Sequence, residues 1–155
     1  MQIRIISLAN KLPEWLVAAS QSYLQRFKYP FAVDILPVKL KQWSGALSVE
    51  QRIEQQTRTL FACVPKGNTI VLLDSLGEQL DSQGLSDRYA DFLASGVNIS
   101  ILIGGPDGFA RKHLTDANQV WSLSRLTLPH ALAQLLLLEQ TYRAMTILQR
   151  HPYHK

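Results

Sequence analysis

Three short segments of the chain contain residue types whose spacing suggests a ligand site. Residues 101–108 read ILIGGPDG and run from an apolar strand into a double glycine and a proline turn. Residues 121–130 read WSLSRLTLPH and place hydroxyl groups beside an arginine, and residues 151–155 form the tail HPYHK. Glycines after a strand let backbone N–H and C=O groups meet the edge of a ligand. Taken singly, the segments also fit a tight turn, a polar connection and a frayed chain end.

Several common kinds of site find no support in the sequence. Gly104, Gly105 and Gly108 do not have the spacing of a dinucleotide-binding fingerprint, and no P-loop lysine is present. The histidines lack Cys or acidic partners at zinc-ligand spacing, so we expect no metal. No Ser or Cys lies in a nucleophile elbow. We expect Cys63 to pack in a helix and His113 to face solvent.

Strands and helices alternate along the chain. Apolar patterns predict strands at residues 2–8, 31–37, 69–74, 97–103 and 120–123. Helical spacing predicts one helix after Pro13 and a second that begins with a capping box of Ser48 and Gln51. Further helices are predicted from Leu85 to Gly96, at residues 109–117 and at residues 129–150. Loops are predicted at residues 38–47 and 77–84. This order predicts an α/β fold, a parallel-rich sheet with helices on both faces. Ligands bind such sheets at the carboxyl ends of the strands.

Composition narrows the class of protein. The chain has 155 residues, 46% of them hydrophobic and 18% charged, which fits a single globular domain of residues 1–155. No apolar run approaches the ~20 residues of a membrane span, and no secretory signal is visible. A lone cysteine fits the reducing cytoplasm. The last helix is apolar on more than one face, which predicts a second copy packed against it in a homodimer.

The net charge of +4 is unevenly distributed. Residues 117–155 carry four basic residues and one acidic residue, Glu139, and a second basic site is the loop with Lys39 and Lys41. A polyanion would bind at these two places. The charge alone fits both an RNA-binding protein and an enzyme that never touches nucleic acid.

In combination, the motifs resemble the RlmH family, the large-subunit ribosomal RNA methyltransferases of the SPOUT superfamily. The resemblance extends along the whole chain. It rests on KLPEW (11–15), YLQRF (23–27), LLD (72–74), IGGPDG (103–108), WSLSRLTLPH (121–130), EQTYRA (139–144) and HPYHK (151–155).

The resemblance implies a SPOUT-type fold with a C-terminal trefoil knot, through which the last helix threads, and an obligate homodimer. It also implies the cofactor S-adenosylmethionine, bound bent in the knot mainly through backbone groups. By motif position, the cofactor contacts would be Leu73, Gly104, Leu123, Ser124, Arg125, Leu126, Thr127 and Leu128.

The implied reaction is methylation of N3 of a pseudouridine in helix 69 of large-subunit (23S) ribosomal RNA, within the assembled ribosome. The N3–H group must lose its proton, so the site needs a base or a group that stabilises the anion. Candidates, from the same or the partner subunit, are His130, Arg143, Tyr153 and His154. The candidates for RNA contact are Trp43, Lys39, Lys41, Arg150 and Lys155.

The chain departs from the family at one position. Many members have Arg where this chain has Gln134, so any role of a charge there is lost or moved. Two alternatives stay open on the sequence alone. One is a related knotted RNA methyltransferase with another target, and the other is a non-catalytic nucleotide- or RNA-binding α/β module.

Overall fold

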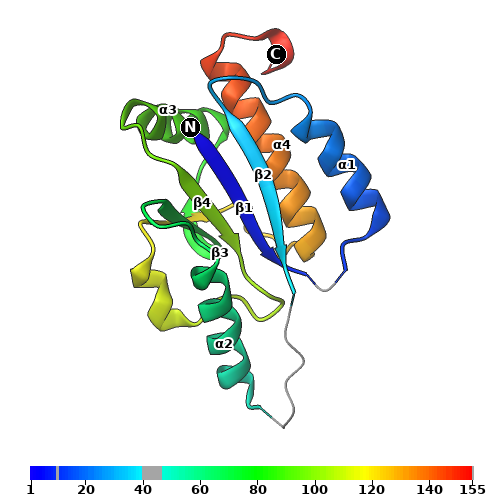
Figure 1. The fold of residues 1–155 in the computed structure, drawn as a ribbon, viewed down its shortest axis with the longest axis vertical. Helices are drawn as coiled ribbons and strands as arrows, with labels where there is room; N and C mark the ends of the chain where they lie inside the picture. The colour runs from blue at the N-terminus through cyan, green and yellow to red at the C-terminus, as the bar shows by residue number, and fades with distance from the viewer. Residues whose placement is uncertain (10, 40–46, 155) are drawn as a thin grey trace.

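The computed structural model describes residues 1–9, 11–39 and 47–154 and shows an α/β fold with a five-stranded sheet (Figure 1). All neighbouring strands pair in parallel, in the order β2-β1-β4-β3-β5. In chain order the elements are β1 (Gln2–Leu8), α1 (Glu14–Leu24), β2 (Ala32–Val38), α2 (Val49–Ala62), β3 (Thr69–Gln79), α3 (Ser82–Ala94), β4 (Ile99–Ile103), the 3-10 helix η1 (Arg111–Asp116), β5 (Gln119–Ser122), α4 (His130–Leu148) and the 3-10 helix η2 (Pro152–His154).

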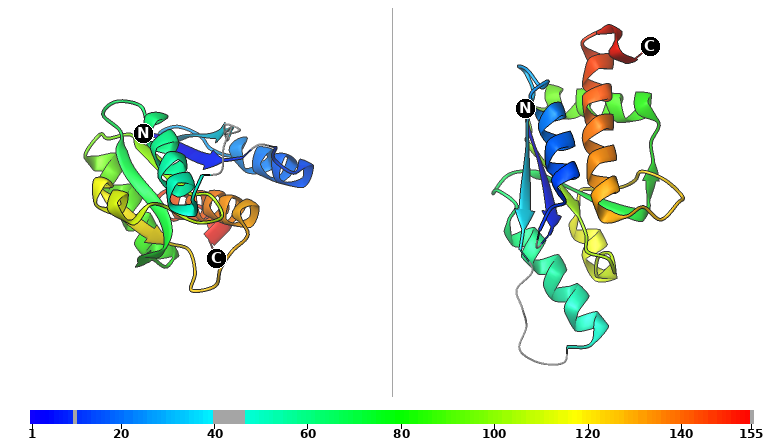
Figure 2. Two further views of the ribbon diagram at one scale, coloured as in Figure 1. Left: turned by 90° about the horizontal axis from the view of Figure 1, so that it is seen from below. Right: turned by 90° about the vertical axis from the view of Figure 1, so that its right-hand side faces the viewer.

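Helices cover both faces of the sheet, as predicted. Ile5 and Ile101 belong to the larger core, which the sheet shares with α3 and α4 and against which side chains of α1 pack. Leu72 and Leu102 belong to a second core on the opposite face, with Leu60 of α2. Figure 2 shows α1 and α4 standing together on one side of the sheet. The central strands are buried on both faces, which explains their continuous apolar sequences.

The structure corrects the predicted loop at residues 77–84. β3 continues to Gln79, and α3 begins at Ser82. The pairing of β3 with β5 is interrupted between Leu73 and Glu78 and then resumes. Backbone pairing with β5 therefore overrides the loop-like composition of this segment, and the interruption makes residues 74–77 bulge out of the sheet.

Two further predictions change in the C-terminal third. The helix predicted at residues 109–117 is the shorter 3-10 helix η1, and the last helix ends at Leu148. Arg150 then takes a positive φ of 52°, which turns the chain back into η2. The tail is folded against α4 and is not frayed, because the Tyr153 ring packs on that of Tyr142.

The last helix keeps an apolar surface beyond its contacts with the sheet. Leu137, Leu138 and Met145 lie in the core, whereas Leu132 remains 47% exposed. No helix in the described part of the chain is long and apolar enough to cross a membrane. The trefoil knot and the single domain of residues 1–155 stay predictions.

Candidate functional site

A pocket of about 430 Å³ lies at the carboxyl ends of β3, β4 and β5. The glycine turn after β4 and the segment between β5 and α4 form much of its wall, as the positions of parallel strand ends require. Of the predicted cofactor contacts, the pocket lining contains Leu73, Gly104, Leu123, Ser124, Leu126, Thr127 and Leu128. The fold thus brings together residues that lie far apart in the sequence, such as Leu73 and Leu128, which are 55 positions apart.

One wall of the pocket is the bulge of β3. Residues 74–76 line the pocket. After Gly77, β3 resumes its pairing with β5 at Glu78. A Cβ atom at Gly77 would lie 2.5 Å from the backbone carbon of Trp121, so no larger residue fits between the two strands. This close approach holds the bulge open beside the pocket.

A second wall is the turn after β4. The Gly108 N–H donates to the Gly105 oxygen at 2.9 Å, and Gly108 has a φ of +76° that favours glycine. A Cβ atom at Gly105 would lie 2.5 Å from Oε1 of the buried Gln56. Glycine is therefore needed here for backbone shape and for close packing against α2.

The third wall presents mostly backbone. The Ser122 hydroxyl donates to the Ser124 carbonyl at 3.0 Å, and the Ser124 hydroxyl accepts from the Leu126 N–H at 2.9 Å. These serines hold the shape of the loop and do not reach for a ligand. The Arg125 side chain is exposed and donates to Gln79 at 3.3 Å, outside the pocket lining. Arg125 could therefore contact a cofactor only through its backbone.

His130, the first residue of α4, lies in the pocket wall. Burial lowers the pKa of its imidazole, although a hydrogen bond to the Gly104 backbone opposes this shift. Its Nε2 atom is buried and has no hydrogen-bond partner among the described residues. At neutral pH the ring is therefore uncharged, and Nε2 is a buried polar atom without a hydrogen-bond partner in the described part of the chain.

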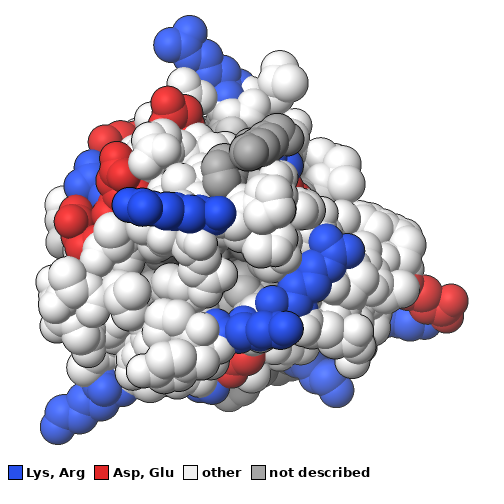
Figure 3. All heavy atoms as spheres, turned by 90° about the horizontal axis from the view of Figure 1, so that it is seen from above, with Lys and Arg blue, Asp and Glu red and all other residues white. Residues whose placement is uncertain are grey.

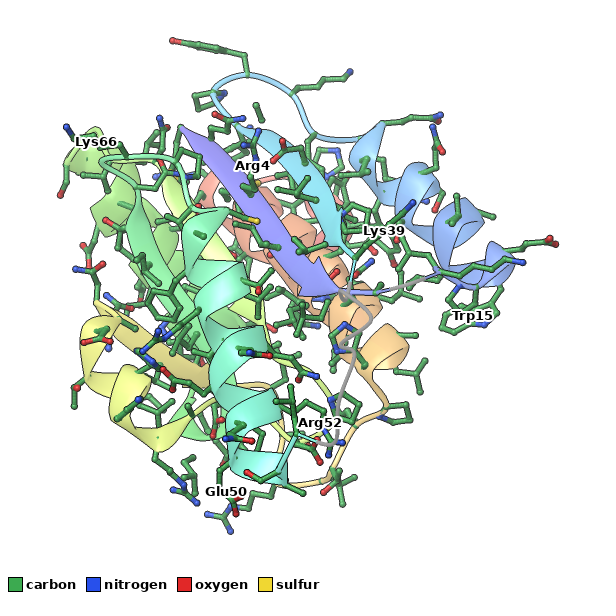
Figure 4. All side chains as sticks on the ribbon, turned by 60° about the horizontal axis from the view of Figure 1, so that its bottom comes forward. Arg4, Trp15, Lys39, Glu50, Arg52 and Lys66 are labelled. Carbon is green, nitrogen blue, oxygen red and sulfur yellow. The ribbon has the colours of Figure 1, made fainter. Side chains whose placement is uncertain are left out.

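Helix α2 fastens the segment after β4 from outside. Arg52 pairs with Asp107 at 3.1 Å, and the Thr57 hydroxyl accepts from the Ala110 N–H at 3.0 Å. Glu54 lies 3.1 Å from Nε2 of His113. Figure 4 shows Arg52 on the lower part of α2, on the side where the strands end. These contacts fix the turn that forms the second wall.

The contact between Glu54 and His113 corrects the predicted solvent-facing histidine. The His113 side chain is only 19% exposed, and its Nδ1 lies 2.6 Å from Asp116. Hydrogen bonds to Glu54 and Asp116 raise the His113 pKa above 6.5. A hydrogen bond to His113 is the main cause that lowers the Glu54 pKa from 4.5 to about 2, and Lys112 and Arg58 add to it.

We predict that His113→Asn lowers the melting temperature most at about pH 5–6, between the ordinary pKa values of Glu54 (4.5) and His113 (6.5). The contribution of His113 to stability is complete below pH 6.5 and is lost as pH rises through its raised folded-state pKa. The contribution of Glu54 is lost only as pH falls from 4.5 towards about 2. Thermal unfolding of both proteins across this range checks the prediction. The prediction would be contradicted if the melting temperatures of the two proteins differed by the same amount at about pH 5.5 and about pH 9.

A second polar cluster lies on the C-terminal half of α4 and is centred on Glu139 in the middle of the helix. Glu139 accepts hydrogen bonds from Arg143 Nη2 at 2.8 Å and from the Tyr153 hydroxyl at 3.4 Å. The guanidinium carbon of Arg143 lies 5.2 Å from the centre of the Tyr153 ring. A hydrogen bond with Tyr23, together with burial and the charge of Glu139, raises the pKa of Tyr153 to about 12. Tyr153 is therefore protonated at neutral pH.

The structure separates the predicted catalytic residues into two groups. His130 begins the 19-residue helix α4, and Arg143 and Tyr153 lie near its other end. Such a helix is about 28 Å long, and Figure 1 shows its first turns near the middle of the molecule and its last turns at the end where the chain terminates. His154 ends η2, but its side chain lies outside the described part of the structure. Arg143 lies about 20 Å beyond His130 along the helix axis, and neither Arg143 nor Tyr153 lines the pocket of its own chain.

Two predicted RNA contacts can be placed. Lys39 follows β2 and is exposed on the same end of the sheet as the pocket (Figure 4), whereas Arg150 is exposed at the opposite end. Basic side chains are spread over that opposite end of the molecule, and acidic ones lie mostly toward one side (Figure 3). Trp43, Lys41 and Lys155 lie outside the described residues.

Sequence reasoning missed several contributors. Gln134 is fully buried and accepts a hydrogen bond from Ser7 at 2.7 Å, so it packs against β1 and has no surface role in this chain. Asp74 lines the pocket, although the sequence marked it only as a strand end. Glu139 could have been found from its i,i+4 spacing to Arg143. The described residues contain no cluster that could hold a metal ion.

Comparison with known proteins shows the family to which this chain belongs. A family profile described as "Predicted SPOUT methyltransferase" matches residues 1–154. The proteins named ribosomal RNA large subunit methyltransferase H from Coxiella burnetii and Saccharophagus degradans are each 37% identical over 155 residues, which is 100% of this chain and 100% of each relative. The protein of that name from a Marinomonas species is 32% identical, with the same full coverage of both chains. The chain therefore belongs to the SPOUT methyltransferase family, and within it to the methyltransferase H group that its motifs resemble.

Proposed function

We propose that this protein is a cytoplasmic enzyme that methylates N3 of a pseudouridine in helix 69 of large-subunit ribosomal RNA, acting on assembled ribosomes with S-adenosylmethionine as methyl donor. The observation that carries the proposal is the pocket at the strand ends. Its volume of about 430 Å³ is that of a small-molecule site, roughly 300–1,000 Å³. The relatives that match the whole chain are named for methylation of the same class of RNA.

The residues of the pocket fit the proposed donor. An adenosyl group offers flat, hydrogen-bonding edges and no phosphate, and the pocket offers backbone groups at Leu73 and Gly104 and along residues 123–128. Leu73, Gly104, Leu123, Ser124, Arg125, Leu126, Thr127 and Leu128 would hold the adenine and ribose mainly through their backbone.

The roles of the charged residues follow from the chemistry of the acceptor. When bound, the donor supplies an electrophilic methyl group on a positively charged sulfur. Because the N3–H of the base must lose its proton, His130 or His154 would accept it, and Arg143 would stabilise the resulting anion. Tyr153 is protonated at neutral pH, so it would donate a hydrogen bond and not act as the base.

The separation between pocket and tail supports a homodimer with a composite site. A two-fold axis across α4 would place the tail of one subunit at the pocket of the other. The exposed Leu132 and the apolar character of α4 supply a surface for this contact. The C-terminal knot is part of the same proposal, because it would bring the glycine turn and residues 122–128 around one ligand.

Ribosomes from a strain that lacks this gene provide the test. We expect the purified protein and S-adenosylmethionine to add one methyl group to a pseudouridine-containing fragment of helix 69, detected by mass spectrometry of the digested rRNA. A methyl group on a different nucleotide would move the target to another RNA. No methylation of ribosomes, subunits or free rRNA would refute the proposed function.

A further inference from the structure

We propose that the carboxylate of Asp74 contacts the positively charged sulfur of the bound methyl donor and makes the pocket prefer the charged donor over its uncharged product. This inference rests on the proposed function and adds a side chain that selects between two ligands of nearly identical shape. Asp74 directly follows Leu73 at the point where β3 leaves its pairing with β5. It lines the pocket and is half-buried.

The two oxygens of Asp74 have different surroundings. Oδ1 accepts a hydrogen bond from the Leu76 N–H at 3.0 Å and so shapes the bulge. Oδ2 lies beside the glycine turn, 3.7 Å from the place where a Cβ atom would lie on Gly108. No hydrogen bond among the described residues involves Oδ2. One oxygen thus fixes the position of the carboxylate, and the other is free for a ligand.

The charge of Asp74 is not neutralised by a neighbour. No ion pair among the described residues includes Asp74. The pocket lining also contains Asp107, which pairs with Arg52, and the exposed Arg111. His130 is uncharged at neutral pH because burial lowers its pKa. Asp74 is therefore the carboxylate of the pocket lining that has no ion-pair partner among the described residues, and the exposed Arg111 is the one cationic side chain of the same lining.

A negative charge at this place discriminates between donor and product. The donor is a sulfonium cation, and the product is a neutral thioether after the methyl group leaves. Near a protein surface, a contact between opposite unit charges favours the charged ligand by about tenfold after desolvation. The same contact stabilises the donor before reaction and weakens as the sulfur loses its charge in the transition state, so its removal should raise KM without lowering kcat.

The test compares calorimetric affinities for S-adenosylmethionine and S-adenosylhomocysteine in the wild type and in Asp74→Asn. Asparagine keeps an oxygen that can accept from the Leu76 N–H but removes the charge. We expect affinity for the donor to fall about tenfold and affinity for the product to stay nearly unchanged. Asp87→Asn is the matched control for loss of one negative charge, and its ratio of affinities should equal that of the wild type because Asp87 is exposed on α3, outside the pocket lining.

The outcomes distinguish a role of the Asp74 charge in selecting the donor from a purely structural role of Asp74 in the bulge. An equal loss of affinity for both ligands in Asp74→Asn would show that Asp74 only shapes the bulge, which would overturn the inference and leave the proposed function standing. Failure of the wild type to bind either ligand would overturn the proposed function itself. If Asp74→Asn does not fold, Asp74→Ser replaces it, because a serine hydroxyl can also accept from the N–H two residues on.

Discussion

Arg143→Gln is expected to lower the rate of rRNA methylation at saturating donor by about 10²–10³-fold, the usual cost of removing one group that stabilises a developing anion. Arg143 is held in place by two hydrogen bonds to Glu139, at 3.1 and 2.8 Å, and by the Tyr153 ring. Glutamine keeps the helix and part of the hydrogen bonding but carries no charge. Because Arg143 is proposed to act on the RNA base and not on the donor, affinity for S-adenosylhomocysteine should change little. Single-turnover methylation and calorimetry measure the two effects.

Mixed dimers show which subunit uses the arginine. A chain with Arg143→Gln retains its pocket. A chain with Gly104→Val loses its pocket, since a Cβ atom at Gly104 would lie only 3.1 Å from Gly108, but it retains its tail. Random exchange of the two inactive proteins should restore about a quarter of wild-type activity if each site combines one pocket with the partner's tail. Arg26→Gln, in the same aromatic cluster, is the control for general loss of positive charge. Absence of any restored activity would place pocket and tail in the same subunit.

Gly77→Ala should cost about 2–3 kcal/mol of stability, in the upper range for overpacking. The added Cβ would lie 2.5 Å from the carbon and 2.7 Å from the nitrogen of the Trp121 backbone. Because both contacts are with backbone, no side-chain rotation relieves them, and β3 and β5 must separate. The bulge of residues 74–77 would lose its shape, so donor binding should be lost as well. Chemical denaturation and calorimetry with S-adenosylhomocysteine measure these effects.

Gly96→Ala is the matched control for this substitution. Gly96 has a φ of +66° at the end of α3, and no atom lies within 4 Å of its Cβ position. Alanine there should cost about 1 kcal/mol through backbone strain alone and leave donor affinity unchanged. If Gly77→Ala bound the ligand as well as Gly96→Ala, the close approach of β3 to β5 would have no part in shaping the pocket.

Much of the fold follows from sequence periodicity. The buried run at residues 69–74 and the capping box of Ser48 and Gln51 predicted their elements, and the structure contains both. The continuation of β3 to Gln79 could not be predicted, because its residues look loop-like and their conformation depends on pairing with β5. The exposed or buried state of His113 likewise depends on Glu54, which is 59 residues away in the chain.

The pocket was more predictable than the tail. Glycines and strand ends indicate where backbone meets a ligand. The family resemblance, not the pattern itself, named the eight cofactor contacts, and seven of them line the pocket. The tail residues carry chemistry without local sequence signals for their position. Arg150, a residue that rarely adopts positive φ, makes the turn that returns Tyr153 to Glu139. The place where Arg143 acts depends on a partner subunit, which no periodicity within one chain specifies.

The most direct test of the central claim is a crystal structure of the protein grown with S-adenosylmethionine. The account predicts an adenosyl group between the Gly104 turn and residues 123–128, with backbone contacts from Leu73 and the tail of a second subunit closing the pocket. A ligand bound elsewhere, or a pocket filled by side chains of the same subunit, would contradict it.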